Sequence, residues 1–104
     1  MNETLDRFSR VDRLGDWRIG PVVGEGRSGM VFEATETVPP FRTGVIKINL
    51  GNGRKSSRKS FVRERAFAAS DILKDGKPEF FAGGDWHGIP YFIMERVTRL
   101  PHNQ

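Results

Sequence analysis

The chain has 104 residues and a mass of 11.8 kDa, and 37% of its residues are hydrophobic, which suffices for one small domain and excludes two. Its 17 basic and 13 acidic residues leave a net charge of +4, and the absence of cysteine excludes disulfides, thiolate metal sites and cysteine nucleophiles. No apolar run approaches the roughly 20 residues that span a membrane, and the N-terminus lacks a signal-peptide core. We therefore expect a soluble, cytoplasmic protein with no membrane partner.

The chain divides into three parts by composition. Residues 1–15 are polar and follow no sustained period, so we expect a leader that is partly disordered or helical. Residues 16–97 carry the apolar patterns of one folded domain, and residues 98–104 are expected to form a linker-like tail.

Five segments are rich in β-prone residues and are predicted to be strands: 17–23, 30–35, 45–50, 79–86 and 89–97. Turn residues separate them where the chain has glycine, proline or asparagine, at 24–29, 38–41, 52–53 and 87–88. Gly20 and Pro21 interrupt the first segment, which predicts an edge strand or a bulge, because proline cannot donate to a central ladder.

The strongest helical pattern runs from Ser57, the expected N-cap, to about Lys74. At 100° per residue, one arc collects the apolar residues Ala68, Phe61, Ile72, Ala69, Val62, Leu73 and Ala66. Glu64 lies at the edge of this arc, where a carboxylate needs a partner, and Arg65 lies inside it, where only its stem can be buried. The expected fold class is α+β, with a five-stranded antiparallel twisted sheet and one main helix.

The first turn holds a glycine motif. Gly24, Gly26 and Gly29 form G-x-G-x-x-G, and Val31 follows two residues later. A dinucleotide-binding loop would need a helix to open at the third glycine, whereas a β-prone segment follows here. The pattern resembles the glycine-rich loop of protein kinases, whose backbone covers the nucleotide phosphates. A plain glycine turn is the alternative for this motif taken alone.

Two further residues extend the resemblance. Lys47 follows Val31 by 16 residues in Gly44-Val45-Ile46-Lys47, which resembles the V-A-I-K strand of the kinases, although an edge-strand lysine is the alternative for this segment alone. Glu64 follows 17 residues later on the predicted helix, where the family has the glutamate that pairs with this lysine. Residues 16–97 together resemble the small lobe of a bacterial serine/threonine protein kinase of the eukaryotic-like type.

The resemblance implies an ATP site. Lys47 and Glu64 would be its catalytic residues, and the residues around ATP would be Val23, Gly24, Gly26, Gly29, Val31, Val45, Lys47, Met94, Glu95 and Val97. Met94 would be the gatekeeper, and the backbone of Glu95 and Val97 would bond the adenine edge. The chain departs from the family at Val45, where alanine is usual, and at Ala68, where a bulky aliphatic is usual and where Phe67 or Ile72 would have to fill the space.

The resemblance covers residues 16–97, and the sequence stops at Gln104, before the family's catalytic loop and Mg²⁺ ligands. We therefore expect no phosphate transfer by this chain alone and weak ATP binding, in the high micromolar range or worse. The alternative is a stand-alone, non-catalytic module that binds a partner protein, or that forms a homo-oligomer through the face a large lobe would cover. The basic stretch over residues 54–65 is expected to be a solvated face and not a nucleic-acid surface.

Overall fold

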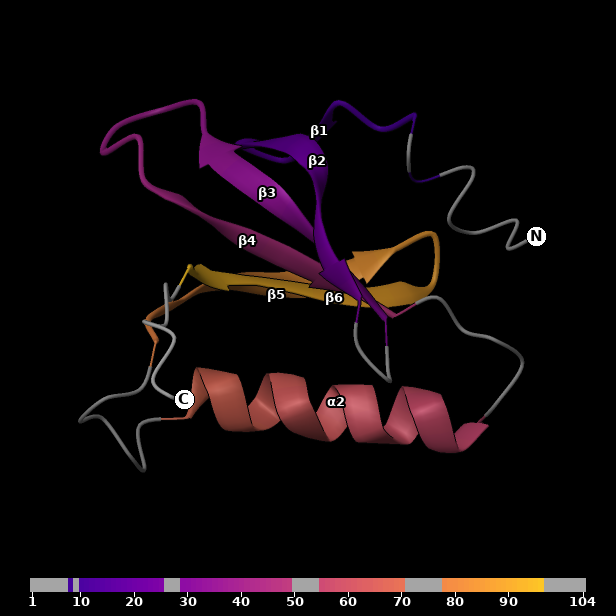
Figure 1. The fold of residues 1–104 in the computed structure, drawn as a ribbon. Helices are drawn as coiled ribbons and strands as arrows, with labels where there is room; N and C mark the ends of the chain where they lie inside the picture. The colour runs from indigo at the N-terminus through magenta and orange to yellow at the C-terminus, as the bar shows by residue number, and fades with distance from the viewer. Residues whose placement is uncertain (1–7, 9, 26–28, 50–54, 71–77, 97–104) are drawn as a thin grey trace, which may run out of the picture.

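A computed structural model of the chain describes residues 8, 10–25, 29–49, 55–70 and 78–96. These residues form an α+β fold in which one helix lies along one face of a curled antiparallel sheet of six strands (Figure 1). The elements are β1 (Arg13–Leu14), β2 (Trp17–Glu25), β3 (Met30–Glu36), β4 (Thr43–Ile48), α2 (Lys55–Ala69), β5 (Phe80–Trp86) and β6 (Ile89–Glu95). The α+β class is confirmed, and the sheet has one strand more than predicted. Within the described residues, no helix is both long enough and apolar enough to cross a membrane.

The strands are ordered β1-β2-β3-β4-β6-β5, and every neighbouring pair is antiparallel. The β5–β6 hairpin turns at His87 and Gly88, with φ of 48° and 79°, and this left-handed pair is typical of two-residue hairpins. Gly20 and Pro21 form a bulge, because the pairing of β2 with β3 shifts between Ile19 and Val22. Since β1 pairs with the start of β2, this part of β2 is not an edge.

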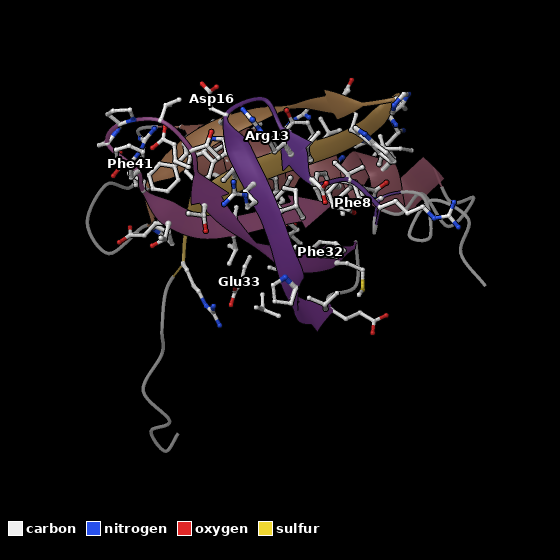
Figure 2. The ribbon with its side chains drawn as sticks, turned by 90° about the horizontal axis from the view of Figure 1, so that it is seen from above. Phe8, Arg13, Asp16, Phe32, Glu33 and Phe41 are labelled. Atoms are coloured by element: carbon white, nitrogen blue, oxygen red, sulfur yellow. The ribbon has the colours of Figure 1, made fainter. Side chains whose placement is uncertain are left out.

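The folded region begins before the predicted boundary at residue 16. Phe8 is fully buried, and 5.0 Å separates the centroid of its ring from that of Phe32. Both residues are labelled in Figure 2, which views the sheet from above. The ring of Trp86, at the end of β5, packs against the Phe8 ring with 5.1 Å between centroids. The N-terminal segment therefore supplies a core residue, and it then enters the sheet as β1.

The main core fills the inside of the curl. Alternate residues of a strand point to opposite faces, so one set of side chains from β2, β3, β4 and β6 points inward. Together with Phe8, this core consists of Trp17, Phe32, Ala34, Ile46, Ile48 and Ile93. The residues between them on the same strands, including Lys47 and Phe92, lie on the other face, which α2 covers in part (Figure 1).

Helix α2 begins at Lys55, two residues before the predicted N-cap, so Ser57 lies within its first turn. The helix ends at Ala69, and the predicted extension to Lys74 falls outside the described residues. Its buried face is narrower than the predicted arc. Phe61 is buried and Ala68 half-buried, whereas the side chains of Val62, Ala66 and Ala69 are exposed.

Candidate functional site

The strand register brings three predicted adenine-site residues to the face that carries Lys47. Val31 on β3 pairs with Lys47 on β4, and Val45 on β4 pairs with Met94 on β6. Directly paired residues of antiparallel strands point to the same side of a sheet, as do residues two apart on one strand. Val31, Val45, Lys47 and Met94 therefore form one half-buried surface across three neighbouring strands.

The predicted ion pair between β4 and α2 is present. The Nζ of Lys47 lies 2.6 Å from the Oε2 of Glu64. The lysine side chain is only 18% exposed, because β3 and β6 flank its strand on both sides, whereas the glutamate side chain is 44% exposed. This arrangement places an ammonium group at the end of an apolar surface, with its position set by a carboxylate from the helix.

The glycines of the loop have two different roles in the structure. Gly29 is buried, and a Cβ at this position would overlap the backbone carbonyl of Ile48. The packing of β3 against β4 therefore requires glycine there, which gives Gly29 a structural explanation. At Gly24, by contrast, a Cβ would meet nothing within 4 Å, so the chain's own packing does not require glycine. Gly26 lies outside the described residues.

The remaining residues of the predicted ATP site are Val23, Glu95 and Val97. Val23 is an extra residue in β2, because Val22 pairs with Phe32 while Gly24 pairs with Val31, and its side chain is exposed. The backbone N–H of Glu95 donates to the carbonyl of Glu79 at 2.8 Å, so this N–H is already engaged and is not available to an adenine edge. Val97 lies outside the described residues.

Two charged groups near this face were not singled out from the sequence. Arg96, just after β6, has Nη1 3.3 Å from Glu33 Oε2, and Glu33 lies on β3 opposite Val45. The pairing spans 63 positions of the chain, so no local pattern could have indicated it.

Phe67, one of the two residues expected to fill the space beside Ala68, is instead 53% exposed, and Ile72 lies outside the described residues.

A hollow of about 380 Å³ lies between α2 and β5, and none of its lining residues belongs to the predicted ATP site. It is lined by Val62, Arg65, Ala66, Ala69, Phe80, Gly83 and Gly84. At about 100° per residue, its lining residues Val62, Ala66 and Ala69 lie on the side of α2 turned away from Glu64. We base the candidate site on the Lys47 face, because that face combines a fixed charge with an apolar surface.

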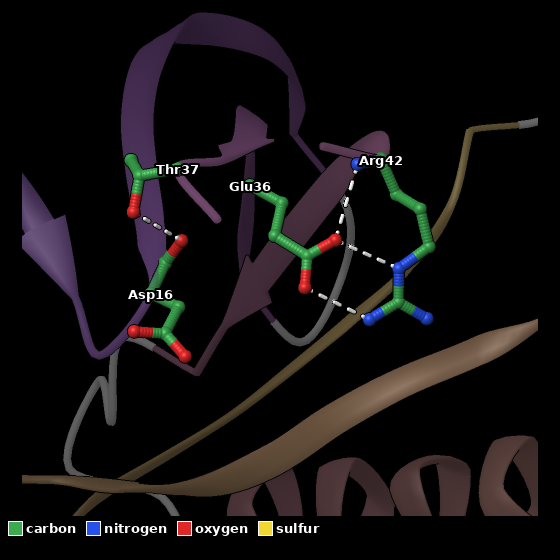
Figure 3. A network of polar contacts seen from close by, with 4 residues as sticks. All are labelled: Asp16, Glu36, Thr37 and Arg42. Atoms are coloured by element: carbon green, nitrogen blue, oxygen red, sulfur yellow. Dashed lines mark hydrogen bonds and ion pairs between the residues drawn. The ribbon is translucent and has the colours of Figure 1, made fainter. Parts of the chain in front are cut away.

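A polar network lies at the loop end of the β3–β4 hairpin (Figure 3). Arg42 donates through Nε and Nη2 to the two oxygens of Glu36, at 2.8 and 3.0 Å, and its backbone N–H donates to the same carboxylate. The hydrogen bonds from Arg42 lower the pKa of the Glu36 carboxyl against an opposing effect of burial. Beside them, Thr37 donates to the backbone carbonyl of Asp16. This network fixes the hairpin and is remote from Lys47.

The basic residues of α2 do not form one uniform surface. Arg58 donates to the carbonyl of Gly88 at 2.8 Å, and Arg65 donates to that of Gly84 at 2.6 Å. Lys59 and Arg63 are exposed. Two of the helix's arginines are therefore engaged with the β5–β6 hairpin.

No protein-family model matches the chain, and a comparison with curated proteins finds no match. The geometry of the described residues therefore carries the functional proposal. In that part of the chain, no three acidic or histidine side chains come close enough together to hold a metal ion.

Proposed function

We propose that this chain is the ATP-binding small lobe of a serine/threonine protein kinase-like protein. The observation that carries the proposal is the ion pair between Lys47 and Glu64, at 2.6 Å. A lysine of a central strand that is held by a helix carboxylate, beside an apolar surface, suits a ligand with a flat apolar ring and a negatively charged end. ATP has both parts.

Under this proposal, the residues of the candidate site have the following roles. Val31, Val45 and Met94 would contact the adenine ring, and the carbonyl of Glu95 would accept a hydrogen bond from its amino group. Lys47 would bind the phosphates, while Glu64 would keep its ammonium group directed toward them. The open space above Gly24 would let the backbone approach the phosphates closely.

The experiment is an ATP titration of the chain and two variants by calorimetry and NMR. We expect the wild-type chain to bind with a dissociation constant in the high micromolar range, because Val31, Val45 and Met94 lie on one sheet face and would contact only one side of the adenine ring. Lys47→Met keeps most of the side-chain stem and should weaken binding by about 10-fold or more. Lys59→Met removes the same charge from an exposed position of α2 and should change binding by less than about 2-fold. Equal effects of the two variants would refute a specific site.

A second candidate function is a non-catalytic module that forms a homodimer or binds a partner protein. It is favoured by Val22 and Val23, two consecutive apolar residues of β2 with 49% and 37% exposure. A second copy that packs on β2 would cover both side chains.

Sedimentation of the chain at tens of micromolar distinguishes a monomer from a homodimer. If Val22 lies in a dimer interface, the wild-type chain should sediment above its 11.8 kDa monomer mass, and Val22→Lys should return it to that mass. Val38→Lys, at a similarly exposed valine after β3, should leave the dimer intact. A wild-type chain that sediments as a monomer at this concentration would refute the dimer.

A further inference from the structure

Helix α2 has little apolar surface with which to keep its place on the sheet. Phe61 is buried, and its ring packs on that of Phe92 with 5.3 Å between centroids. Further along the helix, Ala68 is only half-buried, and Phe67 is exposed. Because an alanine side chain buries only one methyl group, this packing anchors α2 near Phe61 and restrains its rotation weakly.

Arg65 supplies a directional contact one turn after Phe61. Its Nη1 donates to the backbone carbonyl of Gly84 at 2.6 Å, and lies 3.3 Å from Asp85 Oδ1 and 3.5 Å from the carbonyl of Tyr91. A hydrogen bond from a cation is shorter and stronger than one between neutral groups. Arg65 therefore ties α2 to the edge strand β5 and to β6 beside it.

The sheet surface beneath Arg65 is shaped to receive its stem. A Cβ at Gly83 would lie 3.3 Å from Arg65 Cδ and 3.0 Å from Phe80 Cζ, both closer than ordinary van der Waals contact. Glycine at this position leaves the space that the arginine methylenes occupy, and the side chain of Arg65 is 25% exposed. This contact explains the charged residue inside the predicted apolar arc.

Glu64 and Arg65 are consecutive residues that bind the two strands flanking β6. Glu64 reaches Lys47 on β4, and Arg65 reaches Gly84 on β5. Since β6 separates these two strands, the two attachments lie about 10 Å apart across the sheet. Neighbouring residues of a helix point about 100° apart, so a rotation of α2 about its axis would break one of the two contacts. The Arg65 bond thus limits the direction in which Glu64 points.

We propose that Arg65 is a positioning residue, which holds α2 in the orientation where Glu64 meets Lys47. The meaning of this contact for nucleotide binding rests on the proposed function, because the Lys47–Glu64 pair is the part of that site that it positions.

The test compares Arg65→Ala and Arg65→Lys with Arg63→Ala, a matched loss of charge at an exposed position of the same helix. The first measurement is the NMR cross-relaxation between the side-chain protons of Lys47 and Glu64, together with amide hydrogen exchange, neither of which needs ATP. Arg65→Ala should abolish the cross-relaxation and speed exchange of the α2 amides by about 10-fold, while the β3 and β4 amides exchange as in the wild type. Arg65→Lys keeps a cation that can reach a single carbonyl and should restore part of the contact. Arg63→Ala should change exchange by less than about 2-fold.

The second measurement is ATP affinity in a double-mutant cycle with Glu64→Gln. If Arg65 acts through Glu64, the loss caused by Glu64→Gln should be about 10-fold with Arg65 present and below about 2-fold in the Arg65→Ala background. An intact Lys47–Glu64 contact in Arg65→Ala would overturn the positioning role, as would faster exchange throughout the sheet, which marks general destabilisation. If the contact is lost in Arg65→Ala but the wild-type chain does not bind ATP, the nucleotide function fails and the positioning role stands.

Discussion

Lys47 on β4 and Glu64 on α2 form an ion pair with 2.6 Å between Nζ and Oε2, and the glutamate is 44% exposed to solvent. An ion pair in contact with water stabilises a fold by only about 0.2–1 kcal/mol, because solvent screens the charges and both side chains lose rotamer freedom. The stability of the domain therefore gives a weak reason for a lysine on this central strand. A ligand that binds the ammonium group gives a stronger one.

Glu64→Gln separates these two reasons. The amide keeps the size of the side chain but removes the charge that directs Lys47, so the free energy of unfolding should fall by no more than about 1 kcal/mol. ATP affinity should fall by about 10-fold, because the ammonium group is no longer held toward the phosphates. Urea denaturation and calorimetry measure the two effects. Asp12→Asn removes a negative charge at an exposed position distant in the sequence from Glu64, and it serves as the charge control. A large loss of stability with unchanged ATP affinity would contradict a functional role of the pair.

The glycine motif provides a second test, because Gly24 and Gly29 differ in their surroundings. Gly29→Ala would drive its Cβ into the backbone of Ile48 and should lower the free energy of unfolding by about 2 kcal/mol or more. Gly24→Ala meets open space, so its effect on stability should stay within about 0.5 kcal/mol. If the loop covers phosphates, Gly24→Ala should still weaken ATP binding. Denaturation curves and ATP titrations of both variants check this, and a plain glycine turn would leave ATP binding by Gly24→Ala unchanged.

The strands and their hairpins could be predicted from the sequence because their signals are local. Richness in β-prone residues identifies β3 and β6, and the His87-Gly88 pair adopts the left-handed backbone that its composition favours. Lys47 and Glu64 could be paired because each is a charged residue among apolar neighbours on an element of recognisable type. The other residues of the site hypothesis, such as Met94 and Glu95, came from the resemblance to the kinases and not from a local pattern.

The features that were not predicted depend on contacts distant in the sequence. Phe8 is one aromatic residue in a polar stretch, and only the three-dimensional fold brings it to Phe32 and Trp86. Strand β1 has two residues, too few for any periodicity to appear. The helix arc was drawn on the assumption that the buried face is apolar, whereas Arg65 is held there by backbone carbonyls that no sequence pattern identifies.

Phe8 tests whether the N-terminal segment belongs to the fold. Phe8→Ala would leave a cavity between the rings of Phe32 and Trp86 and should lower the free energy of unfolding by about 3–5 kcal/mol. Phe41→Ala makes the same change at a side chain that is 60% exposed, at the end of the molecule away from Phe8 in Figure 2, and should cost less than about 1 kcal/mol. Urea unfolding followed by tryptophan fluorescence measures both. Equal stabilities of the two variants would mean that residue 8 is not a core position in solution.

The Glu36–Arg42 pair predicts how stability depends on pH. Hydrogen bonds from Arg42 hold the pKa of the Glu36 carboxyl below its ordinary value of 4.5. A carboxyl with a lowered pKa in the folded state stabilises the fold above its unfolded pKa, and this contribution is lost as the pH falls through the folded pKa. Glu36→Gln cannot titrate, so its free energy of unfolding should be lower than wild type at neutral pH and should fall less steeply below about pH 4.5. Urea unfolding between about pH 3 and 7, followed by tryptophan fluorescence, measures this. Glu25→Gln, at an exposed glutamate of β2, is the control and should keep the wild-type slope; a Glu36→Gln curve parallel to the wild type would contradict the assignment.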